Sequence, residues 1–291
     1  MKKVLLATTA MALSAGVAYA EVSVSGSARM GLQYTGATGN TTVDNRMTVT
    51  FSGSTETTSG LTLGATMNLR TNDGAASAVS GARVSVAGSG VEVAVGNIYG
   101  AIDSMPGLWI SAGLTGLGWT GVAANTVAKN SFAWDSYTSS DTGVNGVEII
   151  YSSGGFTGHL SYSDADIGSS SNKTAAHVAY AMGDWTAAVA MQDSTTNTQD
   201  KTIVTVSGNV GDFGVNFAAA DNDGERKIVL GGSATFGATK VNAFVADEES
   251  GADTGFGLGL KHDLGGASLV GGVERTVAGV NRADLGVSFS F

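Results

Sequence analysis

Apolar or small residues alternate with polar ones along almost the whole chain after residue 21. In the first segment, residues 22–34, the even positions run from Val22 to Tyr34, and the odd positions are mainly Ser, Arg and Gln. A period of two places side chains alternately on the two faces of a strand, so the segment predicts a half-apolar strand. Segments at 42–52 and 61–70 repeat the pattern. Their lengths exceed the roughly five or six residues usual in soluble sheets and match the roughly nine to eleven needed to cross a bilayer at a tilt.

The alternation divides the chain into sixteen segments, each predicted to be a strand. After the first three, the segments begin near Ala82, Val91, Val147, Phe156, Thr174, Trp185, Thr202, Phe213, Lys227, Thr239, Thr254, Ala267 and Arg282. Short connections such as 183–184 and 211–212 alternate with longer, more polar ones such as 163–173 and 192–201. Tight turns on one side and long loops on the other are typical of membrane barrels, with the turns in the periplasm and the loops outside. In the segments near Thr174 and Thr202, apolar residues fall on both faces, so the pattern leaves their orientation open.

The lipid environment restricts how such strands can be arranged. Every backbone N–H and C=O inside a bilayer must be paired, so the first and last strands are expected to pair with each other. Sixteen strands leave an aqueous channel, whereas about eight fill with side chains. The sequence therefore predicts an all-β fold, a 16-stranded antiparallel transmembrane β-barrel, with apolar faces toward lipid and polar faces toward a hydrated lumen.

The first twenty residues differ from the rest of the chain. Lys2 and Lys3 precede an apolar run at 4–18, and small residues surround Tyr19, which fits a secretory signal peptide over residues 1–20. The run is shorter than the roughly 20 residues of a membrane anchor. Residues 21–291 are then expected to form the barrel.

Composition agrees with this interpretation and excludes other classes. The 291 residues include 43 Gly, one Pro and no Cys, and the formal charge is −10. The Gly content disfavours long helices, the lack of Cys removes disulfides and thiolate sites, and the acidity argues against nucleic acid as a partner. Acidic residues concentrate in the long connections. There Asp221, Asp223 and Glu225 offer oxygen ligands for a surface Ca²⁺ or Mg²⁺ that bridges lipopolysaccharide phosphates, or they simply form a solvated acidic surface. No other cofactor is expected.

The longest connection, residues 98–145, is the third of the long loops. It contains Pro106 and three of the four Trp residues, Trp109, Trp119 and Trp134. Three Trp side chains are difficult to reconcile with a loop exposed to water, so we expect this loop to fold into the lumen. An outward domain or a contact between subunits is the alternative.

Four arginines indicate where a constriction would lie. Arg29, Arg46, Arg70 and Arg83 each occupy the polar phase of one of the first four segments. Facing lipid, each would cost about 2 to 4 kcal/mol near the midplane, so a positive lumen wall is predicted. The alternative is that they only solvate the wall.

Acidic residues on the long loop are candidates for the opposite side of the constriction. They are Asp103, Asp135 and Asp141, accompanied by Lys129. A solute passing between the two groups would be oriented by the field that they create.

Four stretches of sequence resemble the general diffusion porins of Gram-negative bacteria, in particular the alphaproteobacterial, Rhodobacter-type family. They are EVSVSGSARMGL from Glu21, FGATKV from Phe236, HDLGGASLVGG from His262 and ADLGVSFSF from Ala283. The resemblance covers nearly all of residues 21–291. It implies sixteen strands, a homotrimer, and a third loop folded into the lumen, where acidic loop residues face a basic wall.

The family pattern also assigns roles to individual residues. Arg29 and the region of Arg46 match wall positions of the constriction most closely, whereas Arg70 and Arg83 are assigned by strand phase alone. The chain ends on Phe289 and Phe291, and the terminal aromatic resembles the assembly signal of outer-membrane barrels.

The function expected is an outer-membrane channel for passive diffusion of small hydrophilic solutes and ions, not an enzyme. The alternatives are a substrate-selective channel or a barrel enzyme of the outer membrane. GLGWTG at 116–121 lacks the flanking strand and helix of a nucleotide site. His159, His177 and His262 lie far apart in sequence, without the spacing of a metal site.

Overall fold

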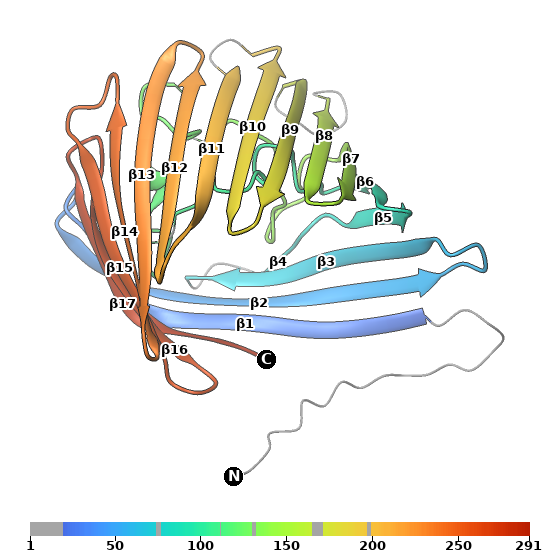
Figure 1. The fold of residues 1–291 in the computed structure, drawn as a ribbon. Coiled ribbons are helices and arrows are strands. Elements are labelled where there is room, and N and C mark those ends of the chain that lie inside the picture. The colour runs from blue at the N-terminus through green and yellow to red at the C-terminus, as the bar shows by residue number, and fades with distance from the viewer. Residues whose placement is uncertain (1–19, 74–76, 111, 130–131, 165–170, 197–198) are drawn as a thin grey trace.

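The protein is a single closed ring of antiparallel strands (Figure 1). The computed structural model describes residues 20–73, 77–110, 112–129, 132–164, 171–196 and 199–291, so residues 1–19 of the expected signal peptide lie outside the described part. The strands are β1 (Ala20–Thr35), β2 (Asn40–Glu56), β3 (Thr62–Asn72), β4 (Ala78–Val79), β5 (Arg83–Gly88), β6 (Val91–Gly96), β7 (Gly146–Ser153), β8 (Phe156–Ser163), β9 (Lys173–Met182), β10 (Trp185–Ser194), β11 (Lys201–Val210), β12 (Phe213–Asn222), β13 (Glu225–Phe236), β14 (Thr239–Glu248), β15 (Gly255–Asp263), β16 (Ser268–Arg275) and β17 (Asn281–Ser290). One 3₁₀ turn, η1 (Trp119–Gly121), lies between β6 and β7.

The first strand closes the ring by pairing on both sides. β1 pairs with β2 from Ala20 to Thr35, and with β17 from Ser27↔Ser290 onward. Beyond that register, the backbone groups of Gly26 and Phe291 exchange two hydrogen bonds of 2.7 and 2.9 Å. The sheet therefore has no open edge, and the closure expected from the lipid environment is confirmed.

The fourth strand of the barrel is interrupted, and β4 and β5 are its two parts. Both pair with β3, so the barrel has sixteen strands, as the alternation predicted. At the break, the Gly81 N–H donates to the carbonyl of Asp141 (2.9 Å). A Cβ on Gly81 would lie 1.9 Å from the Thr142 carbonyl oxygen, so only glycine allows the two backbones to meet. The end of the long loop thus fits into the gap in this strand.

Most strands begin where the alternation placed them. β6, β8, β10, β12 and β14 begin at the predicted residue, and most of the others within one residue. The first hairpin is longer than expected, because β1 and β2 contain 16 and 17 residues and continue as far as Glu56. The prediction ended β2 near residue 52 because the following Gly, Ser and Thr residues carry no apolar signal, yet they pair across from residues 20–22.

The apolar phase of each strand faces outward. Val22, Leu32 and Leu230 are 67%, 54% and 59% exposed on the outer surface, where lipid would cover them. Among the described residues, no helix is long and apolar enough to cross a membrane. The largest group of buried apolar side chains instead lies inside the ring, between the strands and the segment that connects β6 to β7.

Candidate pore constriction

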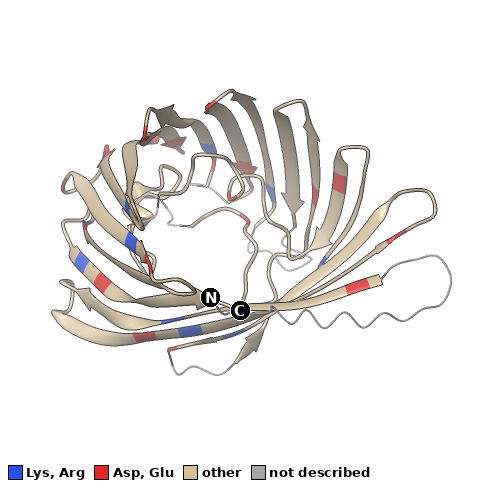
Figure 2. Ribbon diagram, turned by 60° about the horizontal axis from the view of Figure 1, so that its bottom comes forward, with Lys and Arg blue, Asp and Glu red and all other residues tan. Residues whose placement is uncertain are grey.

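The described part of the third loop, residues 97–110, 112–129 and 132–145, runs through the interior of the barrel. Figure 2 shows this segment inside the ring of strands. Its Ile102 and Leu108 are fully buried and belong to one apolar cluster with wall residues that are mostly small, such as Ala179, Ala190 and Ala218. Small side chains on the lumen face of β9–β12 leave room for the loop, so the expectation that the loop folds into the lumen is confirmed.

The first part of the loop is held by polar groups of β7–β9. The Gly100 N–H donates to Glu148 Oε2 (3.1 Å), and the Ala101 N–H donates to Ser161 Oγ (3.0 Å). His177 Nδ1 donates to the Ala101 carbonyl at 2.6 Å. A buried loop must satisfy its backbone groups with partners from the wall, and these side chains supply them.

The return part is held by three adjacent strands, which bind three successive carbonyl groups. Asn222 Nδ2 donates to the carbonyl of residue 123 (3.1 Å) and Lys201 Nζ to that of residue 124 (3.0 Å), while Lys227 Nζ donates to that of residue 125. The next contact involves an acid, since Glu248 Oε1 accepts from the Val127 N–H at 2.7 Å. Charged groups make stronger hydrogen bonds than neutral ones, so this part of the loop is firmly fixed.

The tip of the loop crosses the lumen to the strands that close the barrel. Asp284 of β17 accepts hydrogen bonds from the backbone N–H and the hydroxyl of Thr115 (2.6 and 2.7 Å). Arg29 of β1 donates to the carbonyl of Leu114 (2.8 Å), and Glu274 of β16 accepts from the Gly118 N–H (2.7 Å). Within the described part of the chain, the loop makes no hydrogen bond to β2 or β3, and Arg46, Thr48 and Arg70 of these two strands line a cavity instead.

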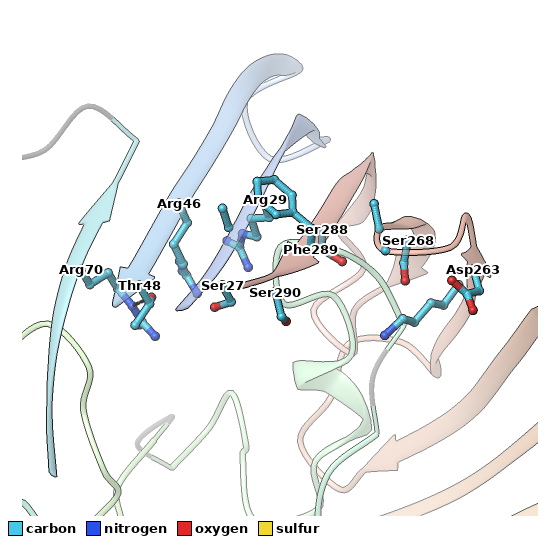
Figure 3. Close-up of a pocket in the computed structure, with 14 residues that line it drawn as sticks. Ser27, Arg29, Arg46, Thr48, Arg70, Asp263, Ser268, Ser288, Phe289 and Ser290 are labelled. Atoms are coloured by element: carbon cyan, nitrogen blue, oxygen red, sulfur yellow. Dashed lines mark hydrogen bonds between the residues drawn. The ribbon is translucent and has the colours of Figure 1, made fainter. Parts of the chain in front are cut away.

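Three of the four predicted arginines lie together on this open side (Figure 3). Arg29, Arg46 and Arg70 line a cavity of about 520 Å³ with Lys261 and Asp263. Apart from Phe289, the rest of the lining is small and mainly hydroxylated: Ser27, Ala28, Thr48, Gly266, Ala267, Ser268, Ser288 and Ser290. Such a lining suits water and small polar solutes.

The three arginines differ in their partners. Arg29 forms a two-pronged ion pair with Asp44, with N···O distances of 2.9 and 2.7 Å, so its charge is largely compensated. Arg46 donates to the Asn72 amide oxygen (2.8 Å) and Arg70 to the Thr48 hydroxyl (2.9 Å). Neither of these two arginines has a carboxylate within ion-pair distance, so each contributes more uncompensated positive charge to this wall than Arg29 does.

Arg83 lies elsewhere in the lumen. It is 5% exposed and paired with Glu148 and Glu92, each at 2.7 Å, with its guanidinium 4.0 Å from the centre of the Tyr99 ring. The structure therefore places it beneath the start of the loop, outside the lining of the cavity formed by the other three arginines.

The three loop acids do not share one face. Asp103 accepts a hydrogen bond from Trp134 Nε1 (2.9 Å), and burial raises its pKa to about 6 although that hydrogen bond acts in the opposite direction. Asp135 is buried against Lys173, with N···O 3.5 Å. Asp141 is exposed, and its carboxylate accepts from the Thr142 N–H (2.7 Å). Asp141 is thus exposed, whereas Asp103 is half-buried and Asp135 is buried.

The remaining predicted loop residues form an aromatic group and an anchor. Trp109, Trp119 and Trp134 cluster with Phe132, with ring centres 3.9 to 6.3 Å apart. The carbonyl of Pro106 accepts a hydrogen bond from the Thr205 hydroxyl (2.6 Å). The loop is therefore bound to the wall at Pro106 and carries a patch of packed rings.

Comparisons with known proteins agree with this architecture. The profile of the family described as Gram-negative porin matches residues 7–278. The chain belongs to the Gram-negative porin family. A porin from Fuscovulum blasticum is 30% identical over 295 residues and one from Rhodobacter capsulatus 29% identical over 309, each covering 93% of this chain and 100% of the relative. A solved mutant of the Rh. blastica porin matches with a TM-score of 0.81 at 28% identity, covering 93% and 100% of the two chains.

The porin is thus an outer-membrane channel, and the fold, function and location expected from its sequence are confirmed. Its family is one of channels rather than enzymes. The aromatic side chains at the C-terminus, Phe289 and Phe291, are exposed on the outer surface with ring centres 6.2 Å apart.

Sequence reasoning missed most of the residues that hold the loop. Glu248 stands next to a polar, acidic connection in the sequence, yet it is buried under the loop. His159 and His177 were treated as unrelated, yet their rings lie 5.4 Å apart on neighbouring strands. A signal was available, because Lys201, Lys227 and Glu248 all stand on inward positions near the long-loop ends of their strands.

The acidic cluster considered for a cation has other contacts in the porin. Asp221 accepts from the Gly224 N–H (2.7 Å), Asp223 pairs with Lys129 (3.6 Å), and Glu225 accepts two hydrogen bonds from Ser250. Among the described residues, no group of three or more His, Asp or Glu side chains is arranged to hold a metal ion.

Proposed function

We propose that small hydrophilic solutes and ions diffuse passively between the third loop and the wall of β1–β3, with Arg29, Arg46 and Arg70 as the wall of the constriction. The observation that carries the proposal is the polar cavity of about 520 Å³ to which Arg46 and Arg70 bring charges without carboxylate partners. Positive groups in a confined lumen raise the local concentration of anions relative to cations. Size is then the main filter, and charge is a secondary one.

Planar-bilayer recording tests this proposal directly. The purified porin should give stable conductance steps, and under a salt gradient the reversal potential should show greater anion permeability than that of a variant with the wall neutralised. Absence of stable steps, or a reversal potential that does not depend on the wall arginines, would contradict it.

We also propose that the porin assembles as a homotrimer, as the family resemblance implies. The lengths of β5 and β6 support this, because each has only six residues, fewer than the roughly nine to eleven needed to cross a bilayer. Strands this short do not span the hydrocarbon core, so this side of the barrel is where another subunit would take the place of lipid. Cross-linking in mild detergent should give a trimer that dissociates on heating, and a species that remains monomeric before heating would contradict the proposal.

Lipopolysaccharide is the partner proposed for the outer rim. A groove of about 400 Å³ includes the outward-facing Thr174, Met191 and Thr202, together with Asp193 and Asp221. Carboxylates there can share Ca²⁺ or Mg²⁺ with lipid phosphates, which would supply the oxygen ligands that the protein lacks. The Asp193→Asn and Asp221→Asn variants should lose Ca²⁺-dependent retention of lipopolysaccharide during purification, and unchanged retention would contradict the proposal.

We propose no catalytic activity for the porin. One group resembles a hydrolytic triad, because Ser104 Oγ lies 3.3 Å from His159 Nδ1, and His159 Nε2 lies 2.9 Å from Glu148. The Ser104 hydroxyl, however, donates to the carbonyl of Gly100, and His159 is buried. A nucleophile must give its proton to the histidine, so these contacts suit loop anchoring better than catalysis. Ester hydrolysis that is lost in Ser104→Ala would contradict this view.

A further inference from the structure

A second cavity of about 510 Å³ lies on the other side of the lumen, between the loop and β10–β14. It shares no lining residue with the cavity at the arginine wall. Asp184 and Lys240, which border it, lie beside the short turns, so the cavity is at that end of the barrel. The loop contributes Trp109 and Ile110. Its volume falls within the roughly 300–1,000 Å³ typical of small-molecule sites.

Trp109 presents a fixed aromatic surface to this cavity. Its indole N–H donates to the carbonyl of Asp103 (2.8 Å), and the edges of Trp119 and Trp134 pack against it with ring centres 5.6 and 6.3 Å away. In spite of these contacts, 43% of Trp109 remains exposed. An indole that is held at its polar edge and still exposed in a wet lumen is preorganised for contact with a ligand that has an apolar face.

The wall opposite the loop is rich in carboxamides. The side chains of Asn209 and Asn242 make no hydrogen bond to any other residue that the structure describes. The Asn216 amide donates to the Gly107 carbonyl (2.8 Å), while its Oδ1 atom is buried without a partner among the described residues. A carboxamide both donates and accepts, which matches a hydroxyl group. Asn209 and Asn242 can therefore bind hydroxyl groups of a ligand without breaking existing contacts, whereas the Asn216 amide is bound to the loop and its Oδ1 atom is buried.

The charge and shape of the cavity restrict the ligand further. One acid and one base, Asp184 and Lys240, border it, so the charged side chains of the lining sum to zero. A flat aromatic solute would need apolar surface on both faces, but beyond Trp109 only Ile110 and Val215 are large and apolar in the lining. A pyranose ring has one apolar face and a rim of hydroxyl groups, and it is uncharged.

We propose that this cavity is a subsite for a neutral saccharide, whose ring stacks on Trp109 while its hydroxyl groups bind Asn209 and Asn242. The inference rests on the proposed function, since the sugar must reach the lumen by diffusion. It adds a solute class that the channel holds transiently and thereby favours over other neutral solutes of equal size.

Single-channel recording with maltotriose tests the subsite. Maltotriose added on the short-turn side should reduce the current in a saturable manner, whereas polyethylene glycol of similar size should reduce it without saturation. Trp109→Ala should weaken the apparent affinity by about tenfold, the loss of one contact worth about 1.4 kcal/mol. Trp109→Phe should restore part of it. Trp185→Ala, on the lipid-facing side of β10, is the matched control and should leave the affinity unchanged.

A second variant avoids the loop. In Asn209→Ala/Asn242→Ala, open-channel steps should remain and the affinity for maltotriose should fall several-fold, so this variant decides the matter if Trp109→Ala fails to fold. Equal, unsaturable effects of maltotriose and polyethylene glycol would overturn the subsite, as would saturable block by adenosine but not by maltotriose. Either result with normal steps leaves the proposed channel function intact, whereas the absence of steps contradicts that function itself.

Discussion

Lys201 on β11 and Lys227 on β13 donate hydrogen bonds to adjacent carbonyl groups of the third loop, those of Ala124 and Asn125. The two strands are the neighbours of β12 on either side. Both lysines are almost fully buried, and Lys227 also pairs with Glu248 (N···O 3.5 Å). Burying a cation is costly unless it is paired or hydrogen-bonded, so the loop and the lysines stabilise one another. The position of the constriction thus depends on charges that no solute touches.

Replacing Lys201 with methionine should loosen the loop without opening the barrel. The change keeps the apolar stem but leaves the carbonyl of residue 124 without its donor, at a cost of about 1–3 kcal/mol. We expect faster proteolysis within residues 112–129 and noisier open-channel current. Lys240→Met, also in the lumen but without a hydrogen bond or ion pair to other described residues, is the control. Equal noise in the two variants would contradict the anchoring role.

Neutralising Arg46 and Arg70 together should shift the ion preference more than neutralising Arg29. The charge of Arg29 is already balanced by Asp44, whereas Arg46 and Arg70 have neutral partners. Arg46→Gln/Arg70→Gln should move the reversal potential under a salt gradient clearly toward cation preference. Arg29→Gln should move it as well, because it frees the Asp44 charge, but by about half as much, since one guanidinium is lost instead of two. Equal or reversed shifts would contradict the assignment of these three charges to the wall of the ion path.

Ionisation of Asp103 should make stability depend on pH. Its pKa is raised from the ordinary value of 3.8 to about 6, mainly by burial. Between these values the folded porin retains a proton that the unfolded chain has released, so stability should fall as the pH rises from about 4 to about 6. The unfolding temperature in detergent would measure this fall.

Asp103→Asn should remove that contribution, because an amide does not ionise. Asp141→Asn is the matched control, since the Asp141 side chain is exposed and lies on the same loop. It should keep the slope of the parent porin. If Asp103→Asn has the same slope as the parent, another group carries the pH dependence.

Adding one methyl group at Gly81 should disturb the join between the loop and the fourth strand. The new Cβ would lie 1.9 Å from the carbonyl oxygen of Thr142, which belongs to backbone and cannot easily move aside. We expect a loss of about 1–3 kcal/mol, seen as a lower unfolding temperature and a lower refolding yield. At Gly53, where the nearest atom would be 3.9 Å away, the same substitution should have little effect.

The strands were predictable because the bilayer imposes a simple rule on each of them. An outward apolar face and an inward polar face give the same period of two in every strand, and this local pattern located the first residues of β6 and β14 correctly. The alternation did not show which face points outward where the side chains that face the lumen are also apolar. Ile203 and Val204 are equally apolar, yet Ile203 is fully buried under the loop while Val204 is 44% exposed outside.

The candidate site was predictable in its residue types but not in its pairings. Four inward arginines follow from strand phase, but their partners come from other strands and from the loop. Asp44 compensates Arg29, and Glu148 holds Arg83 beneath the loop, away from the cavity. Residues that are 15 and 65 positions apart meet only because of strand register and loop path.

By itself, the sequence determined the class of protein, the number of strands, the face that each arginine occupies and the entry of the long loop into the lumen. These features depend on a local period and on the cost of exposing polar backbone to lipid or Trp side chains to water. Only the tertiary structure decided which charges remain unpaired, which polar groups hold the loop, and that there are two separate cavities, one at the arginine wall and one between the loop and β10–β14. Those outcomes depend on distances across the lumen, which no local pattern encodes.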